Sequence, residues 1–229
     1  MDQKQIKRNL NYFTKSDTPL YVGIGMLVVG VVLFFFGISY LSYILASVLA
    51  VAGLVLMLIG ASGRVSDADI DTCIASLTED MAVDLVENPK FAKRMLGQIP
   101  VLHLQSYLYK EGLRYRIAKS GSIRSELYQS CIVYALDTEL YVVLRRIPLL
   151  GEQIDAQIIE IPYSEIQGVE SVQSEYSLTI GKKLYTVTPT ALCIRAAQPL
   201  EIPMQNTADV DEFISRISRI LAEHANKSE

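Results

Sequence analysis

A long stretch without charged side chains constrains this chain more than any other feature. No Asp, Glu, Lys or Arg occurs between Asp17 and Arg64, and most of the intervening residues are aliphatic or Phe. As a single helix, residues 18–63 would extend for ~69 Å at 1.5 Å per residue, more than twice the ~30 Å hydrocarbon core of a bilayer. The stretch therefore predicts two transmembrane helices that form a hairpin.

The two transmembrane helices are predicted within residues 20–60, at 20–37 and 41–60. The segment between them starts at Gly37 and combines two serines with a tyrosine suited to the membrane interface. Thr18 is the predicted N-cap of the first helix, and Pro19 fits its first position, where the missing N–H costs nothing. A cleaved signal peptide is disfavoured because the apolar run is too long and a second one follows at once.

Small residues recur on one face of each predicted helix. Such residues let helices approach closely in lipid, so we predict that they pack the two helices together. The alternative is that Gly and Ala are simply common in membrane helices. The predicted packing residues are Gly23, Gly30 and Gly37 in the first helix and Ala46, Ala50, Gly53 and Gly60 in the second.

The distribution of basic residues predicts the orientation in the membrane. Four basic side chains precede the first helix, whereas the connection between the helices carries no charge. By the positive-inside rule, residues 1–19 are a cytoplasmic N-terminal segment. Since two helices return the chain to the same side, both termini are expected in the cytoplasm, with the hairpin in the plasma membrane. Ile6, Leu10 and Phe13 share one helical face, which predicts either a short in-plane helix or a frayed tail.

Residues 64–100 are predicted to be a helical linker. Ser66 is a suitable N-cap, the aspartates that follow favour the positive end of the helix dipole, and Asn88-Pro89 ends the helix. A short second helix is expected at residues 91–96. The apolar residues of the first linker helix recur at helical spacing at Ile70, Ile74, Leu77, Met81 and Leu85.

Residues 101–224 are predicted to form an antiparallel β domain. From about residue 102 the apolar period changes to two, as in Leu113, Tyr115 and Ile117, and turn residues recur at short intervals. Many short strands separated by turns are typical of an antiparallel barrel or sandwich. A C-terminal amphipathic helix follows, with Asn206 or Thr207 as its N-cap. Its apolar face comprises Val210, Phe213, Ile214, Ile217, Ile220 and Leu221.

Residues 161–170, with the sequence Ile-Pro-Tyr-Ser-Glu-Ile-Gln-Gly-Val-Glu, resemble the I-P-Y-x-x-I-x-x-V stretch of bacterial pleckstrin-homology-like (PH-like) domains. A preceding two-helix membrane hairpin is also similar to proteins of that group. The resemblance covers residues 102–222 and departs from eukaryotic PH domains because the chain has no tryptophan. It implies an α+β protein, in which a transmembrane hairpin precedes a PH-like antiparallel barrel or sandwich capped by the C-terminal helix.

A group of basic residues around the first predicted strand pair is the candidate binding site. In PH domains that bind phosphoinositides, basic residues at the first hairpin hold the phosphates, so the resemblance implies binding of a lipid or phosphate. Glu111 and Glu126 dilute this group, and the alternative is an ordinary solvated strand face. The candidate residues are Lys110, Arg114, Arg116, Lys119 and Arg124.

Motifs of catalysis and metal binding are missing from the sequence. The two histidines, His103 and His224, stand outside any HExxH motif, and no GxSxG, P-loop or GxGxxG pattern occurs. Cys73, Cys131 and Cys193 are widely spaced, which predicts three buried thiols rather than a zinc site or a disulfide framework. We therefore expect no enzyme activity, no cofactor and no metal.

The predicted function is a non-enzymatic, membrane-anchored binding or scaffold module that engages a partner protein or the membrane surface. Nucleic acid is not an expected partner, because the formal net charge is −4 and the acidic excess lies after the basic N-terminal segment. One alternative is an accessory or regulatory subunit of a membrane transporter or envelope enzyme that associates through the hairpin. Another is an enzyme acting on lipid, which predicts a pocket with clustered, perturbed titratable groups.

Overall fold

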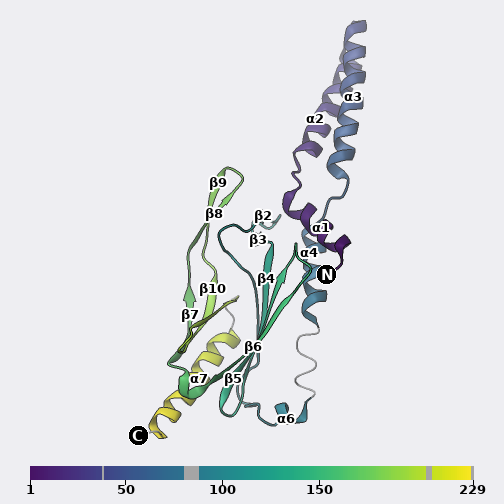
Figure 1. The fold of residues 1–229 in the computed structure, drawn as a ribbon. Helices are drawn as coiled ribbons and strands as arrows, with labels where there is room; N and C mark the ends of the chain where they lie inside the picture. The colour runs from purple at the N-terminus through teal and green to yellow at the C-terminus, as the bar shows by residue number, and fades with distance from the viewer. Residues whose placement is uncertain (38, 80–87, 205–207, 228–229) are drawn as a thin grey trace. The chain divides into compact units, whose positions relative to one another are not determined.

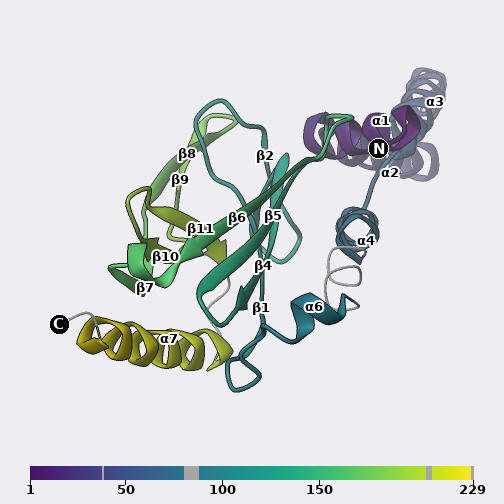
Figure 2. The same cartoon turned by 60° about the horizontal axis from the view of Figure 1, so that its bottom comes forward.

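The computed structural model describes residues 1–37, 39–79, 88–204 and 208–227 (Figures 1 and 2). These residues form two compact units. The smaller unit is Lys7–Ser66, and the larger consists of Asp67–Glu229 together with Met1–Ile6. The smaller unit contains two apolar helices, and the larger contains antiparallel sheets and a C-terminal helix, so the chain is of the α+β class.

The chain begins with helix α1, Gln3–Thr14. A helix is therefore present where the sequence predicted either a helix or a frayed tail. Helix α2, Thr18–Phe36, and helix α3, Tyr40–Ala61, follow, and both are long and apolar enough to cross a membrane. The prediction that Thr18 is the N-cap of α2 was wrong by one residue, because Asp17 takes that position and Thr18 opens the helix.

The serines of the predicted break start the second apolar helix. Ser39 is the N-cap of α3, and its side chain accepts a hydrogen bond from the backbone N–H of Ser42 at 3.3 Å. The hydroxyl of Ser42 in turn accepts one from the N–H of Ser39 at 3.1 Å. This reciprocal capping satisfies two backbone donors at the start of the helix, which is why the chain turns here and becomes helical again at once.

The predicted small residues lie where α2 and α3 meet. A Cβ atom added to Gly23 would lie 2.7 Å from the carbonyl oxygen of Gly53. At Gly30, an added Cβ would lie 3.0 Å from the carbonyl oxygen of Ala46 and 3.1 Å from the backbone nitrogen of Ala50. Any larger side chain would therefore push the two backbones apart, as expected where small residues allow close helix packing.

Two further glycines lie at the ends of the hairpin. A Cβ on Gly60 would lie 2.6 Å from the backbone nitrogen of Leu20. One on Gly37 would collide with the carbonyl oxygen of Leu33 in the same helix and lie 2.7 Å from the hydroxyl of Ser42. Gly37 thus accommodates the turn that ends α2, whereas Gly60 accommodates the opposite helix.

Seven strands of the larger unit form two antiparallel sheets. The four-stranded sheet has the order β1-β4-β5-β6, and the three-stranded sheet has the order β11-β10-β7. The first sheet comprises β1 (Leu102–Tyr107), β4 (Leu127–Ala135), β5 (Glu139–Pro148) and β6 (Asp155–Pro162). The second comprises β7 (Gly168–Gln173), β10 (Thr190–Arg195) and β11 (Leu200–Met204).

Two short ribbons are inserted between these strands. The pair β2 (Tyr115–Ile117) and β3 (Ile123–Ser125) interrupts the connection from β1 to β4. The pair β8 (Tyr176–Ile180) and β9 (Lys183–Val187) does the same between β7 and β10. Gly181 turns the second ribbon with a positive φ of 65°, a conformation that favours glycine.

The prediction of a barrel needs correction. Among the described residues the strands form open sheets and no closed barrel, because β1 and β11 lie beside each other without a hydrogen-bonded register. Strand β11 was not predicted, and it contains Pro203, which lacks the N–H that an inner strand needs. A proline is tolerated in β11 because this strand lies at the edge of its sheet.

The main core lies between the two sheets and beneath helix α7, Ala208–Lys227, which runs along one side of the sheets in Figure 2. Val210, Phe213 and Ile217 of α7 are fully buried in it. The residues of the I-P-Y-x-x-I-x-x-V stretch that lie in this core are Ile161, Tyr163, Ile166 and Val169. That stretch therefore encodes core packing between β6 and β7.

A second, smaller apolar cluster lies on the outer face of the four-stranded sheet. It is built on Ile132 and Tyr134 and is covered by Phe91 of the short helix α6, Pro89–Ala92. Helix α4, Asp67–Thr78, is joined to β5 by Arg145, which donates to the carbonyl oxygen of Leu77 at 2.9 Å. The predicted helix residues Met81 and Leu85, the predicted caps Asn206 and Thr207, and the side chain of His224 lie outside the described residues.

Candidate functional site: a tyrosine-lined groove

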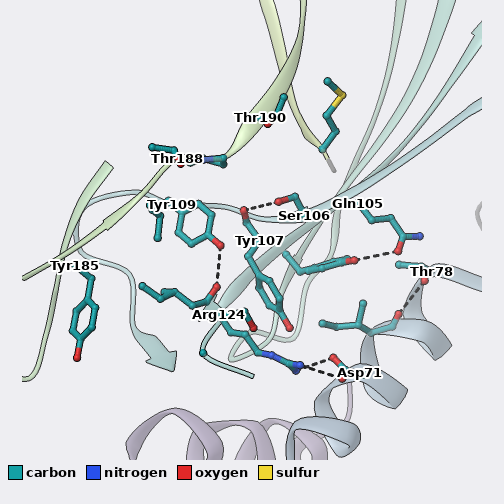
Figure 3. A pocket seen from close by; sticks show the side chains of 18 of the residues that line it. Asp71, Thr78, Gln105, Ser106, Tyr107, Tyr109, Arg124, Tyr185, Thr188 and Thr190 are labelled. Carbon is teal, nitrogen blue, oxygen red and sulfur yellow. Dashed lines mark hydrogen bonds and ion pairs between the residues drawn. The ribbon is translucent and has the colours of Figure 1, made fainter. Parts of the chain in front are cut away.

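A groove of about 1250 Å³ lies on the larger unit, where α4, β1, the β2–β3 ribbon and the segment from β9 to β10 come together (Figure 3). Its walls come from parts of the sequence that are far apart. Helix α4 supplies Asp71 and Thr78, β1 supplies Gln105, and the β9–β10 segment supplies Tyr185 and Thr190. At this volume the groove exceeds the ~300–1,000 Å³ of ordinary small-molecule pockets.

Tyrosines give the groove its chemical character. Tyr107 and Tyr128 contact each other edge to face, with ring centroids 5.0 Å apart. Tyr109 donates from its hydroxyl to the carbonyl oxygen of Ile123 at 2.9 Å, which holds β3 in place. The ring of Tyr185 lines the opposite wall. Rings fixed in this way offer flat contact surfaces at little cost in conformational entropy.

Helix α4 is joined to the β2–β3 ribbon by an ion pair. Arg124 contacts the carboxylate of Asp71 through both terminal nitrogens, with Nη1–Oδ1 at 2.7 Å and Nη2–Oδ2 at 3.1 Å. Nη1 also donates to the carbonyl oxygen of Asp67 at 3.2 Å, and the backbone N–H of Lys119 donates to the Asp67 carboxylate at 2.9 Å. These contacts fix the α4 wall of the groove.

The buried tyrosine hydroxyls of the groove stay protonated near neutral pH, because burial raises their pKa. Burial raises the pKa of Tyr107, an effect that the nearby Arg124 guanidinium opposes. Burial likewise raises the pKa of Tyr109 and Tyr128. The hydroxyl of Tyr107 forms no hydrogen bond of standard geometry with the described residues, although Arg124 lies close to its ring. The phenols are therefore neutral groups that stack and form hydrogen bonds.

The structure distributes the five predicted basic residues around the β2–β3 ribbon. Arg116 and Arg124 are opposite each other in the register of β2 and β3. The side chain of Arg124 is only 12% exposed because it faces Asp71, and Arg114 lies 3.8 Å from a carboxylate oxygen of Glu126. Lys110 and Lys119 are exposed. Arg114 and Arg124 thus already face carboxylates.

Sequence reasoning missed the groove itself, including Asp71 and the tyrosines. The signal available was the tyrosine content, since the chain has 13 tyrosines and no tryptophan. Three of the tyrosines that line the groove, Tyr107, Tyr109 and Tyr128, fall within about twenty residues of one another in the sequence. Such a local excess of one aromatic residue marks a surface on which aromatic contacts matter.

Metal and thiol chemistry find no support in the described part of the chain. No group of three or more His, Cys, Asp or Glu side chains is placed there to hold a metal ion. The three cysteines are buried, as predicted, and burial raises the pKa of Cys131 to about 12. His103 lies exposed on β1, at the edge of a separate small cavity.

No family model, curated protein or solved structure matches the chain. The fold and the groove alone therefore define the class: a protein with a two-helix apolar hairpin and an α+β domain that carries an open, tyrosine-lined groove.

Proposed function

We propose that this chain is a membrane-anchored, non-enzymatic, PH-like binding module whose cytoplasmic domain engages a partner protein through the tyrosine-lined groove. The observation that carries the proposal is the groove itself. Its volume of about 1250 Å³ and its many aromatic and hydroxyl-bearing side chains suit a macromolecular ligand. Anchoring in the membrane would raise the local concentration of the module near membrane-bound partners.

The hairpin supports membrane insertion through its length and its surface. Helices of 19 and 22 residues extend for about 28 and 33 Å, close to the ~30 Å hydrocarbon core. Their outward faces carry large apolar side chains, including Phe36, which is 80% exposed, and Leu41, which is 76% exposed. The basic residues before α2 favour the cytoplasm for both termini by the positive-inside rule. We propose the plasma membrane as the site of insertion.

The arrangement of strands supports the PH-like identity. A four-stranded antiparallel meander is followed by a three-stranded one, and α7 packs against the core between them. The I-P-Y-x-x-I-x-x-V stretch joins the two meanders, with its apolar residues buried. The β2–β3 and β8–β9 ribbons are insertions into this plan. Together these features support the resemblance of the domain to bacterial PH-like domains.

Site-specific photo-crosslinking in the membranes of producing cells tests the proposed function. A photoreactive residue at Thr188, in the groove, should give discrete protein adducts, whereas one at Glu152, outside the groove, should not. The variant Ala75→Trp, which fills the groove from α4, should abolish the Thr188 adducts. The matched variant Ala156→Trp, on exposed β6, should leave them intact. Equal adducts from both positions, or adducts unaffected by Ala75→Trp, would contradict the proposal.

A second candidate function is an accessory subunit of a membrane transporter or envelope enzyme. It is favoured by a groove of about 370 Å³ on the hairpin, lined by Gly30, Phe34, Ala46 and Ser47 among others. A side chain from another membrane helix would fit there. Ser47→Phe should then prevent co-purification of such a partner in detergent, while crosslinking from Thr188 persists. The third possibility, an enzyme acting on lipid, has least support, because the buried tyrosines of the groove have raised pKa values and stay protonated near neutral pH.

A further inference from the structure

Helix α1 is held at the end of the apolar hairpin where α2 begins and α3 ends. Only residues 15–17 separate α1 from α2. The ammonium group of Lys15 donates to the carbonyl oxygen of Ser62, and a Cβ added to Gly63 would lie 3.2 Å from the side-chain amide nitrogen of Asn11, in the last turn of α1. Figure 1 shows α1 lying across this end of the hairpin rather than continuing the line of α2.

An ion pair joins the chain just before α2 to the chain just after α3. Nη2 of Arg64 lies 3.0 Å from Oδ1 of Asp17. These two residues bound the uncharged stretch of the sequence, so charged side chains begin at the same level in both helices. If the hairpin spans the membrane, this level is the boundary between the hydrocarbon core and the lipid headgroups.

Helix α1 combines an apolar face with basic side chains. It contains Lys4, Lys7 and Arg8 and no acidic residue. Leu10 and Phe13 are three positions apart and share one face of the helix, and 37% of Leu10 is exposed. Lys7 and Arg8 are exposed on other sides of the helix. A helix of this composition lies in the plane of a membrane interface, and its basic residues attract anionic lipids.

We propose that α1 lies in the headgroup region of the membrane and binds phospholipids with anionic headgroups through Lys7 and Arg8. This inference rests on the proposed insertion of the hairpin and adds a lipid partner to the proposed protein partner. Each basic residue near an anionic membrane surface strengthens the attraction about fivefold. The connection between α2 and α3 carries no charged residue, so anionic lipid should not be enriched at the opposite end of the hairpin.

The chain has no tryptophan, so single introduced tryptophans can report the lipids around chosen positions. Leu10→Trp places one on the apolar face of α1, and Leu41→Trp places one at the start of α3, where Leu41 is 76% exposed. Each full-chain variant is reconstituted in nanodiscs that contain equal amounts of phosphatidylglycerol and phosphatidylcholine, with bromine on the acyl chains of only one of them. Bromine quenches tryptophan on contact, so comparing the two brominated lipids measures local enrichment.

Around Leu10→Trp, phosphatidylglycerol should be enriched over phosphatidylcholine by about fivefold or more. Leu41→Trp should be quenched equally by the two brominated lipids. When Lys7→Gln and Arg8→Gln are added to Leu10→Trp, the preference should disappear. Lys7→Arg with Arg8→Lys is the matched control, because this pair keeps both charges and should preserve the enrichment.

Equal quenching of Leu10→Trp by the two lipids, the same preference at Leu41→Trp, or a preference that survives the glutamine substitutions would overturn anionic lipid binding by α1. Quenching of Leu41→Trp by both lipids without any quenching of Leu10→Trp would overturn the placement of α1 and leave the insertion of the hairpin standing. No quenching of Leu41→Trp would contradict the membrane anchoring on which the inference rests. The Thr188 adducts test the groove independently.

Discussion

The guanidinium of Arg124 and the carboxylate of Asp71 form a two-point ion pair between β3 and α4, with nitrogen–oxygen distances of 2.7 and 3.1 Å. The resemblance to PH-like domains predicted that Arg124 binds phosphate. In the structure its planar fork meets a carboxylate instead, which satisfies the same geometry. Arg124 therefore builds a wall of the groove.

Asp71→Asn should weaken the contact between α4 and the β2–β3 ribbon. The change removes the Asp71 carboxylate from a guanidinium that is only 12% exposed, while Asp71 itself is 58% exposed. We expect a loss of about 1 kcal/mol in the free energy of unfolding, between the values for surface and buried pairs. Urea unfolding of the full chain in detergent measures it. Glu170→Gln is the control, because its partner Arg195 is 60% exposed. This variant should lower the free energy of unfolding by less than about 0.5 kcal/mol.

Gly23→Ile should separate the two apolar helices, whereas Gly25→Ile should not. A Cβ at Gly23 would lie 2.7 Å from backbone atoms of α3, but one at Gly25 meets no atom within 4 Å. Distances between spin labels at Tyr21 on α2 and Ile59 on α3 report the separation in nanodiscs. A broadened or lengthened distribution is expected for Gly23→Ile alone. Identical distributions for the two variants would show that close glycine packing does not hold the hairpin together.

Tyr163→Phe should change how stability depends on alkaline pH. The hydroxyl of Tyr163 donates to the carbonyl oxygen of Leu136 at 2.8 Å, and burial raises its pKa from 10.0 to about 12. Because the folded-state pKa is the higher one, this contribution to stability is complete below pH 10 and is lost as the pH rises toward 12. The variant should lose about 1 kcal/mol at pH 7 and show a shallower decline above pH 10. An unchanged slope in urea unfolding between pH 7 and 11.5 would refute this account.

Cys131 should resist alkylation while the protein is folded. Its side chain is fully buried, and burial raises its thiol pKa to about 12, so almost no thiolate exists at pH 8. Iodoacetamide followed by peptide mass spectrometry should find Cys131 unmodified in the native chain and modified after denaturation. Rapid native modification would mean that the core between the two sheets opens readily.

The hairpin and most strands could be predicted from the sequence because they depend on local patterns. An uncharged apolar run fixed the two helices to within two residues at each end, and the Ser39–Ser42 segment correctly marked the break. Alternation of apolar residues found most of the strands. Strand β11 was not predicted; it contains Pro203, and proline is compatible with a strand only where the strand lies at a sheet edge, which the sequence does not show.

The candidate site could not be predicted in the same way because it depends on tertiary contacts. Arg124 and Asp71 are 53 residues apart in the sequence, and nothing local indicates that they pair. Likewise, the position of β1 at the end of its sheet, beside β11, follows from the order of the strands and their packing. A sequence pattern shows that Gln105 and Tyr107 lie in a strand, but only the topology shows that the strand is terminal.

Cysteine accessibility in intact cells tests the central claim most directly, namely that the apolar hairpin crosses the membrane and leaves the domain in the cytoplasm. The native cysteines are buried, so they give little background. A membrane-impermeant maleimide should label Ser39→Cys, at the start of α3, in intact cells, and should label Lys182→Cys, in the β8–β9 turn, only after permeabilisation. Labelling of Lys182→Cys in intact cells, or equal protection of both positions, would contradict the account.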